Sequence, residues 1–463
     1  MRRSIRERLL PLLALLAALV LMAAACGDSG SGGEPAATGG DGGSSESTTS
    51  AAPDTSASSQ ESTTTTAEAM EDVTLTVWSW RPEDEDAYNR IFDVYESEHP
   101  GVTVEFVAFV NTDYNNILST GLTGDGGPDV VQLRAYGGVQ PLIEAGQLMP
   151  IDGTVDLSNF TDSALKVSTG VSDGHIYGVP FAYQAFTAFY NKGIFDKLGL
   201  SEPTTWDEWI STLDTLKANG YIPISTPAAA DSTWMIPIVH DAIAAPRYGG
   251  QEFEKALLSG EKDFTDPDYV ASIALMQDLQ QYLPDDVVGV SYEDSKTLFL
   301  TEQAGIFIGG SFEIGFWRDN GPDLDIGVFP VPAAPGSSAG PSVVGWMDGS
   351  FGVNANSDAP DAATDLVNWM GSEEFGQLFT TEIKQLSPIP GTTPEDPLLA
   401  EFGDLYSASP VSYLSLVNFR YGDPSADSIL REGVVKIWLG DSTPEQVAAD
   451  VQAGVSQWFT PQG

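Results

Sequence analysis

Cysteine is almost absent from this sequence: Cys26 is the only one among 463 residues. A disulfide within the chain is therefore excluded, and so is a structural zinc site with two or more cysteine ligands. The three histidines, His99, His175 and His240, do not stand at a metal-ligand spacing from one another. We interpret them as surface or structural residues, and we expect neither a metal nor a cofactor.

Positive charge is also scarce. Lys and Arg together number 20 against 66 for Asp and Glu, which gives a formal net charge of −46. A face that binds nucleic acid needs clustered Lys and Arg, so this balance argues against DNA or RNA as a partner. It also argues against attachment of the folded part to anionic lipid head groups. The low density of Lys and Arg argues against a highly anionic ligand as well. We interpret the acidic residues as a strongly solvated surface.

The local signatures of several enzyme classes are missing. The sequence has no P-loop, no HExxH, no GxSxG around a plausible serine and no cysteine nucleophile. We therefore expect a protein that is not an enzyme. A secreted glycoside-active enzyme remains an alternative, because the paired carboxylates of glycosidases carry no fixed local signature. A surface lipoprotein without a transport role is a third class.

The N-terminus has the pattern of a signal peptide over residues 1–25. Four arginines stand within the first eight residues, and residues 9–22 are apolar apart from Pro11. Such a stretch is short for a membrane span, which needs about 20 residues. The small residues before Cys26 resemble a bacterial lipobox, with Ala23 where leucine is usual. The resemblance implies lipidation of Cys26; plain secretion with cleavage nearby is the alternative.

Residues 27–70 contain no aromatic residue, no Val, Ile or Leu, and no Lys or Arg. Such a segment cannot bury enough apolar surface to fold, and as a flexible coil it would span on the order of 35 Å. We predict a lipid-anchored, disordered linker over residues 26–70 that holds a folded body at the extracellular face of the cytoplasmic membrane. A linker of this kind indicates location and not activity.

Beyond the linker, short strand-like runs alternate with amphipathic stretches. Strands are expected at 73–78 and 102–109, residues 127–132 are expected to form a turn that leads into a third strand, and helices are expected at 83–99 and 114–121. This alternation predicts an α/β fold with a parallel sheet that helices cover on both faces. Ligands bind at the carboxyl ends of strands in such sheets, and those ends carry residues 79–81 and 134–136. Thr205 and Glu208 have the spacing of a capping box, which predicts a helix from residue 206.

The stretch from Gly174 to Leu200 organises the chain. Its apolar, aromatic-rich part runs from Tyr177 to Tyr190, and Pro180 prevents it from forming one helix. Such a composition favours a strand that is buried on both faces. We interpret it as a central strand that leaves one packed unit and enters another; an ordinary buried strand is the alternative.

Several motifs occur in a consistent order along the chain. They are YGVP at 177–180, YNK at 190–192, PTTWDE at 203–208, and AG followed by GSF within 304–312. Together they resemble the extracellular solute-binding proteins of sugar ABC importers, the maltose-binding-protein-like group, over residues 73–459. The resemblance implies a periplasmic-binding-protein-like (type II-like) fold with two discontinuous α/β lobes and a ligand cleft between them.

The resemblance also implies where the lobes begin and end. The N-terminal lobe would comprise residues 71–182 and 336–388, and the C-terminal lobe residues 183–335 and 389–463. A second crossing is expected at 325–332 and a third near 387–390. A glycine-rich turn is expected at 343–349, before another strand.

Sugar recognition needs flat aromatic faces against the apolar side of a pyranose and polar groups for its hydroxyls. The candidates for stacking are Trp80, Tyr136, Tyr183, Trp234, Phe312 and Trp346. The candidates for polar contact are Arg81, Gln184, Ser311, Glu313, Asp348, Gly349 and Arg420. Most stand in turns after strands, where side chains reach a cleft. The alternative for any single aromatic residue is packing in the core or the hinge.

The resemblance implies the extracellular substrate-binding receptor of an ABC importer. It would bind a mono- or oligosaccharide between its lobes and deliver it to the transmembrane subunits of the permease. We expect a monomer that is attached to the membrane through its N-terminal lipid anchor and does not bind nucleic acid.

Overall fold

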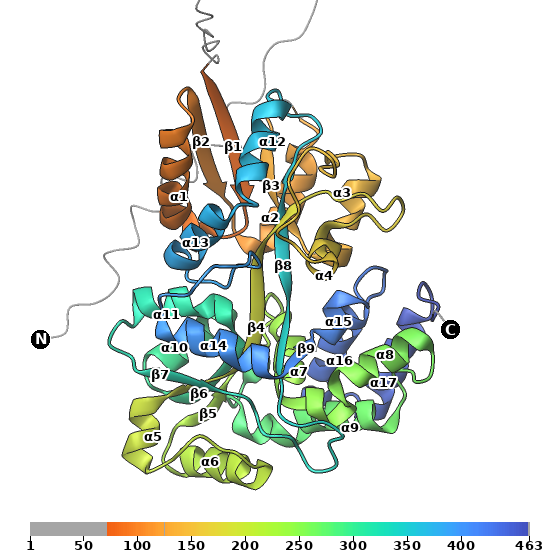
Figure 1. The fold of residues 1–463 in the computed structure, drawn as a ribbon. Helices are drawn as coiled ribbons and strands as arrows, with labels where there is room; N and C mark the ends of the chain where they lie inside the picture. Colours follow the sequence, from red (N-terminus) through yellow and green to blue (C-terminus); the bar gives the residue numbers. More distant parts are fainter. Residues whose placement is uncertain (1–71, 125, 462–463) are drawn as a thin grey trace, which may run out of the picture. The chain divides into compact units, whose positions relative to one another are not determined.

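The computed structural model describes residues 72–124 and 126–461 (Figure 1). The predicted signal peptide, Cys26 and the predicted linker lie outside the described residues. Within the described part, no helix combines the length and the apolar character that a membrane crossing requires.

The described strands form one mixed sheet in the order β2-β1-β3-β8-β4-β6-β5, with β7 beside β4 and β9 beside β8. The strands are β1 (Val73–Ser79), β2 (Val102–Ala108), β3 (Val130–Arg134), β4 (Val179–Asn191), β5 (Ile222–Ser225), β6 (Ala304–Gly310), β7 (Ile326–Phe329), β8 (Val343–Val353) and β9 (Pro410–Ser412). The pairs β1–β2, β1–β3, β5–β6 and β8–β9 are parallel. The parallel sheet predicted from the alternation over residues 73–132 is confirmed for β1, β2 and β3. At the centre of the sheet, β8 runs antiparallel to both β3 and β4, and β4 runs antiparallel to β6 and β7.

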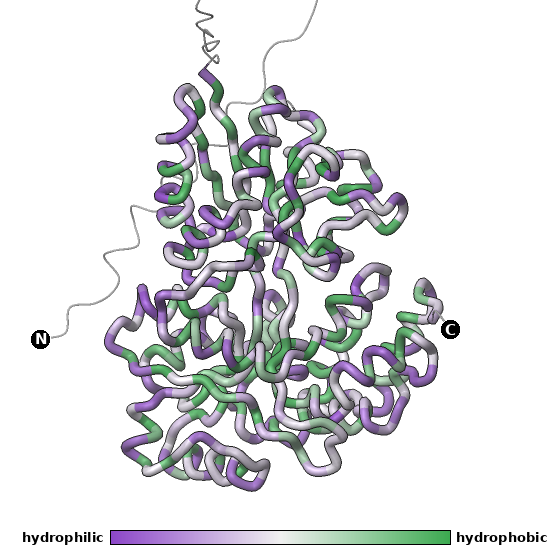
Figure 2. The backbone as a smooth tube through the Cα atoms, in the orientation of Figure 1, coloured by the Kyte–Doolittle hydropathy of each residue, from purple (hydrophilic) through white to green (hydrophobic). Residues whose placement is uncertain are grey.

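Helices cover the sheet, and their hydrophilic sides gather at the periphery of the fold (Figure 2). The α-helices are α1 (Glu85–Glu98), α2 (Asn111–Gly121), α3 (Gln140–Glu144), α4 (Asp162–Leu165), α5 (Lys192–Leu198), α6 (Trp206–Ala218), α7 (Met235–Tyr248), α8 (Gly250–Ser259), α9 (Pro267–Asp278), α10 (Tyr292–Leu300), α11 (Ile314–Asn320), α12 (Pro360–Trp369), α13 (Glu373–Glu382), α14 (Pro397–Ala408), α15 (Leu414–Val417), α16 (Ala426–Leu439) and α17 (Pro444–Val455). The predicted capping box of α6 is confirmed: the side chain of Thr205 accepts a hydrogen bond from the backbone of Glu208, and the side chain of Glu208 accepts one from the backbone of Thr205.

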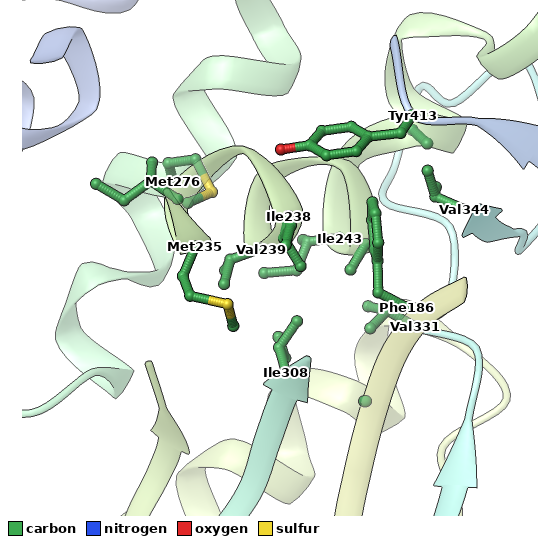
Figure 3. Packing of buried hydrophobic residues seen from close by; sticks show 14 of the residues in the cluster. Phe186, Met235, Ile238, Val239, Ile243, Met276, Ile308, Val331, Val344 and Tyr413 are labelled. Carbon is green, nitrogen blue, oxygen red and sulfur yellow. The ribbon is translucent and has the colours of Figure 1, made fainter. Parts of the chain in front are cut away.

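The buried residues fall into two separate clusters. The first joins β1, β2 and β3 to helices such as α1, α12 and α13. The second is larger and joins β5, β6 and β7 to helices such as α7, α9 and α16. Figure 3 shows part of this second cluster, which includes Phe186 of β4, Val344 of β8, and Ile238 and Val239 of α7.

Two long strands, β4 and β8, belong to both clusters. In β4, Val179 packs in the first cluster and Phe189 in the second. In β8, Trp346 packs in the second cluster and Phe351 in the first. The predicted central strand is therefore confirmed as β4, and its pairing with β8 is irregular between Pro180 and Tyr183.

The second crossing lies within β8 and not at residues 325–332. Val328, Phe329 and Val344 all pack in the second cluster, so the chain returns to the first cluster only after Trp346. The first part of the segment 336–388, which the resemblance assigned to the N-terminal lobe, thus packs with the other core.

The predicted glycine-rich turn at 343–349 is also wrong, because these residues are continuous strand in β8. The glycines serve close approach between strands. A Cβ atom on Gly349 would lie 2.4 Å from the backbone oxygen of Leu133 and 2.9 Å from the ring of Phe181.

Candidate functional site

A cavity of about 750 Å³ lies between segments of the two clusters. From the side of the first cluster, Trp80 and Arg81 follow β1, and residues 110–112 follow β2. From the side of the second cluster, the start of α7, helix α10 and the turn after β6 complete the wall. The carboxyl ends of β1, β2 and β6 thus open into one space, as expected for a ligand site in an α/β sheet. Its volume is within the range of small-molecule sites.

Aromatic side chains form the wall on the side of the second cluster. The ring of Trp234, at the start of α7, meets that of Tyr292 on α10 with centroids 4.9 Å apart at 63°. Phe312, after β6, lies 6.3 Å from Trp234 and 6.3 Å from Trp346. Trp234, Tyr292 and Phe312 all line the cavity, and all three are partly exposed. Such rings can stack against the apolar face of a ligand.

Trp80 faces the cavity from the other side, but one of its faces is already covered. The guanidinium of Arg134 lies 4.1 Å from the centroid of the Trp80 ring, a cation–π contact. Burial lowers the pKa of Arg134 to about 10, although Asp348 favours its charged form. Trp80 is only 4% exposed and also contacts Tyr114 and Phe181.

Charged residues follow Trp80 along the wall. Arg81 forms an ion pair with Asp84 and lies 3.5 Å from a carboxylate oxygen of Glu83. Burial raises the pKa of Asp84 and that of Asp348, and in both cases the charge of Arg81 opposes the increase. These groups form a compact polar cluster between the end of β1 and β8.

A family model described as bacterial extracellular solute-binding protein matches residues 80–377. The chain belongs to this family.

Named relatives agree with this assignment. An uncharacterized ABC transporter extracellular-binding protein from Pyrococcus horikoshii is 26% identical over 43% of this chain, and the match spans 47% of that relative. The multiple sugar-binding protein of Streptococcus mutans is 25% identical over 68% of this chain and 74% of its own length. The mannitol-binding protein of Pseudomonas aeruginosa is 24% identical over 82% of this chain and 86% of its own length.

Solved structures share the fold. A structure concerned with xylan utilization by the thermophilic bacterium Caldanaerobius polysaccharolyticus matches with a TM-score of 0.71 at 22% identity, over 82% of this chain and 99% of that chain. The predicted fold class of an α/β solute-binding protein is thus confirmed.

The cavity of this solute-binding protein brings together five of the predicted site residues. They are Trp80, Arg81, Trp234, Phe312 and Glu313. Of the others, Asp348 joins the polar cluster around Arg81, and Gly349 contributes backbone at the crossing of β8.

Gln184 and Ser311 form a hydrogen bond with each other. Both are fully buried; the Ser311 hydroxyl donates to Oε1 of Gln184 at 2.8 Å, and Nε2 of Gln184 donates to Oε1 of Gln385 at 2.6 Å. The same Nε2 lies 3.4 Å from the carboxylate of Asp348. Because the amide of Gln184 is engaged on both sides, its role in this structure is to connect β4, the turn after β6 and the segment at residue 385.

Tyr136 and Tyr183 line a different cavity, of about 300 Å³. Successive side chains of a strand point to opposite faces, so Tyr183 and Gln184 of β4 cannot face the same space. The ring of Tyr183 instead lies 4.7 Å from that of Tyr406. Tyr136 has a left-handed backbone (φ 55°), and its hydroxyl accepts a hydrogen bond from the backbone of Met347 at 3.2 Å.

Trp346 and Arg420 are the remaining predicted residues. Trp346 lines the smaller cavity, but it is only 7% exposed and packs between Phe186 and Tyr413, with centroids 5.5 Å and 5.4 Å away, so it is largely a core residue. Arg420 lines neither cavity; its side chain is 42% exposed, with Nε 4.0 Å from the carboxylate of Asp427.

Tyr292 and Lys296 of α10 are among the cavity residues that the sequence analysis did not predict. They stand one turn apart, a spacing that places both on one face of a helix. Nothing in the local sequence shows that this face meets the turn after β6. The hydroxyl of Tyr292 donates to the carboxylate of Glu313, and Nζ of Lys296 lies 4.3 Å from the centroid of the Tyr292 ring.

Within the described residues, no group of three or more His, Cys, Asp or Glu side chains could hold a metal ion. The buried His240 contacts Asp241 and Ser272 at 2.8 Å and 3.0 Å, which is a structural role.

Proposed function

We propose that this protein is the substrate-binding receptor of an ABC importer and that it binds a mono- or oligosaccharide in the 750 Å³ cavity. The observation that supports this most is the aromatic wall of Trp234, Tyr292 and Phe312, which faces the charged residues after β1 across that cavity. Aromatic faces and hydrogen-bonding groups are the two requirements of a sugar site. The sugar- and mannitol-binding relatives agree with this ligand class.

The working cycle that we propose is a population shift between open and closed forms. A ligand that contacts the segments of both clusters favours the closed form in proportion to its additional contacts there. Residues 71–182 and 183–335 would supply most of the two lobes, and the closed form would deliver the ligand to the permease. Lipidation of Cys26 would hold this monomer at the extracellular face of the membrane.

A thermal-shift screen tests the binding step. Mannitol, melibiose, raffinose, xylo-oligosaccharides and chitin oligosaccharides form a suitable first set, and at least one saccharide should increase the melting temperature in a saturable manner. A ligand at 100 times its Kd stabilises the folded state by about 2.7 kcal/mol. If no sugar or polyol changes the melting temperature, the proposal is wrong.

A reducing-end assay separates a receptor from a glycoside-active enzyme. After prolonged incubation with a bound oligosaccharide, a receptor leaves the ligand intact and binds it in a fixed stoichiometry. Progressive release of reducing ends would instead favour the enzyme.

A further inference from the structure

This inference rests on the proposed function and concerns the charge of the ligand. Four cationic side chains line the cavity, and each has a carboxylate partner. The pairs are Arg81 with Asp84, Arg90 with Glu382 at 2.7 Å, Lys296 with Glu293 at 2.9 Å, and Lys384 with Asp319 at 3.9 Å. A ligand carboxylate or phosphate would therefore have to break one of these pairs or lie beside carboxylates that nothing neutralises.

Glu313 differs from the other carboxylates of the wall. It is 1% exposed, and within the described residues no cation lies within salt-bridge distance of it. The Tyr292 hydroxyl is the hydrogen-bond donor that the described residues supply to its carboxylate, and that hydroxyl contacts Oε1. No hydrogen-bond donor among the described residues contacts the second carboxylate oxygen, Oε2, and Glu313 is part of the cavity wall.

The Tyr292 ring, whose hydroxyl donates to Glu313, is held by neighbours on two sides. The Tyr292 ring rests against Trp234, with centroids 4.9 Å apart. Behind it, Nζ of Lys296 lies 4.3 Å from the Tyr292 ring and 3.8 Å from that of Phe316, and Lys296 is 6% exposed. A phenol that is packed in this way holds its hydroxyl, and thus the carboxylate, in one orientation.

We propose that Tyr292, with Lys296 behind it, is a positioning residue that orients Glu313 to accept a hydrogen bond from a hydroxyl or ammonium group of the ligand. The ligand class is then an uncharged or amino-bearing saccharide, and sugar acids and sugar phosphates are rejected.

The protonation of Glu313 agrees with this role. Burial raises its pKa to about 7, against the charge of Lys296, the hydrogen bond from Tyr292 and the charge of Arg81; the nearby Glu293 adds to the increase. The ionised carboxylate is the stronger acceptor. Affinity should therefore increase as the pH rises through 7. Removal of the Tyr292 hydroxyl removes a contact that favours the ionised form, so the midpoint of this dependence should move to higher pH.

Matched saccharides test the ligand class. The set is glucose, glucosamine and glucuronate, the same three forms of galactose, and the trimers of each, titrated calorimetrically into the wild-type protein at pH 8. The tightest ligand should be a neutral or amino form. Tightest binding of a uronate would overturn this inference and leave the proposed function standing. Binding of no member, together with no response in the wider thermal-shift screen, would overturn the proposed function and this inference with it.

The Tyr292→Phe variant tests the positioning role, since it keeps the ring and removes the hydroxyl. Its matched control is Tyr282→Phe, which removes a hydroxyl that donates to Asp214 at 2.8 Å and does not line the cavity. With the tightest saccharide, titrated between pH 5.5 and 8.5, Tyr292→Phe should bind about tenfold more weakly and with a higher midpoint. Tyr282→Phe should match the wild type. An unchanged midpoint in Tyr292→Phe, with or without a loss of affinity, would overturn the positioning role.

Discussion

Trp234 has the surroundings of a ligand contact. It is only partly buried, it lines the cavity, and its ring packs against those of Tyr292 and Phe312. A ring held in this way presents a preformed surface to a sugar and loses little side-chain entropy on binding.

The Trp234→Ala variant should therefore lose the saccharide-dependent increase in melting temperature. Its unliganded free energy of unfolding should decrease by only about 1–2 kcal/mol, because Trp234 packs at the edge of the second cluster and is only partly buried. The matched control is Trp209→Ala: Trp209 is fully buried, so its loss should cost about 3–5 kcal/mol. Thermal melts with and without ligand measure both. A loss of basal stability as large as that of Trp209→Ala would show that Trp234 is a core residue.

Glu313 connects the cavity to the pH dependence of stability. Burial raises its pKa from 4.5 to about 7, so between these values the folded state keeps a proton that the unfolded chain has released. Its contribution to the free energy of unfolding is fully present below pH 4.5 and is lost as the pH rises through 7.

The Glu313→Gln variant should lack this contribution to the pH dependence. The melting temperature of the unliganded wild type, relative to that of the variant, should decrease steadily between pH 4.5 and 7.5. Melts of the two proteins in the same buffers measure the difference. A constant difference across this range would contradict the raised pKa.

At the scale of elements, β8 carries the connection between the two cores. It lies between β3 and β4, and Gly349 pairs with Arg134 of β3 and Ala182 of β4. No side chain fits at Gly349, because a Cβ atom there would lie 2.4 Å from the backbone oxygen of Leu133.

The Gly349→Ala variant should be less stable than the wild type by about 2 kcal/mol or more, because the strands must separate to admit the methyl group. Gly340→Ala is the matched control, since a Cβ atom on Gly340 would meet nothing within 4 Å. Urea unfolding of the two variants measures the difference. Equal stability would mean that β3 and β8 can move apart without cost.

Local sequence was sufficient where local chemistry decides the structure. Thr205 and Glu208 predicted the start of α6, and the composition of residues 177–190 predicted β4. The prediction of a turn at 343–349 was wrong because the glycines there allow neighbouring strands to approach closely. The local sequence does not show those neighbours. The same reason explains the site: the turns after β1 and β6 could be predicted to reach a cleft, whereas Tyr292 faces it only through the packing of α10.

At the scale of the whole described body, the aromatic residues predicted to bind a sugar lie in two different cavities. Trp80, Trp234 and Phe312 line the larger cavity, whereas Tyr136, Tyr183 and Trp346 line the smaller one. The sequence could place Trp80 and Phe312 in turns after strands, but which cavity Tyr183 of β4 and Trp346 of β8 would face depended on the register and bulge of that pairing.

The two clusters share β4 and β8, and the chain passes between them again between Ile389 and Leu398. In the proposed cycle, a small change in the twist of these few segments would move one cluster against the other while each core stays intact, as in a hinge. The proposed closure over a ligand requires this motion.

Small-angle X-ray scattering with and without the saccharide that gives the largest thermal shift tests the central claim most directly. The radius of gyration should decrease at saturating ligand, and it should not decrease in the Trp234→Ala variant at the same ligand concentration. An unchanged radius of gyration in the wild-type protein, with a saccharide shown by calorimetry to be bound, would contradict closure of the two halves over the ligand.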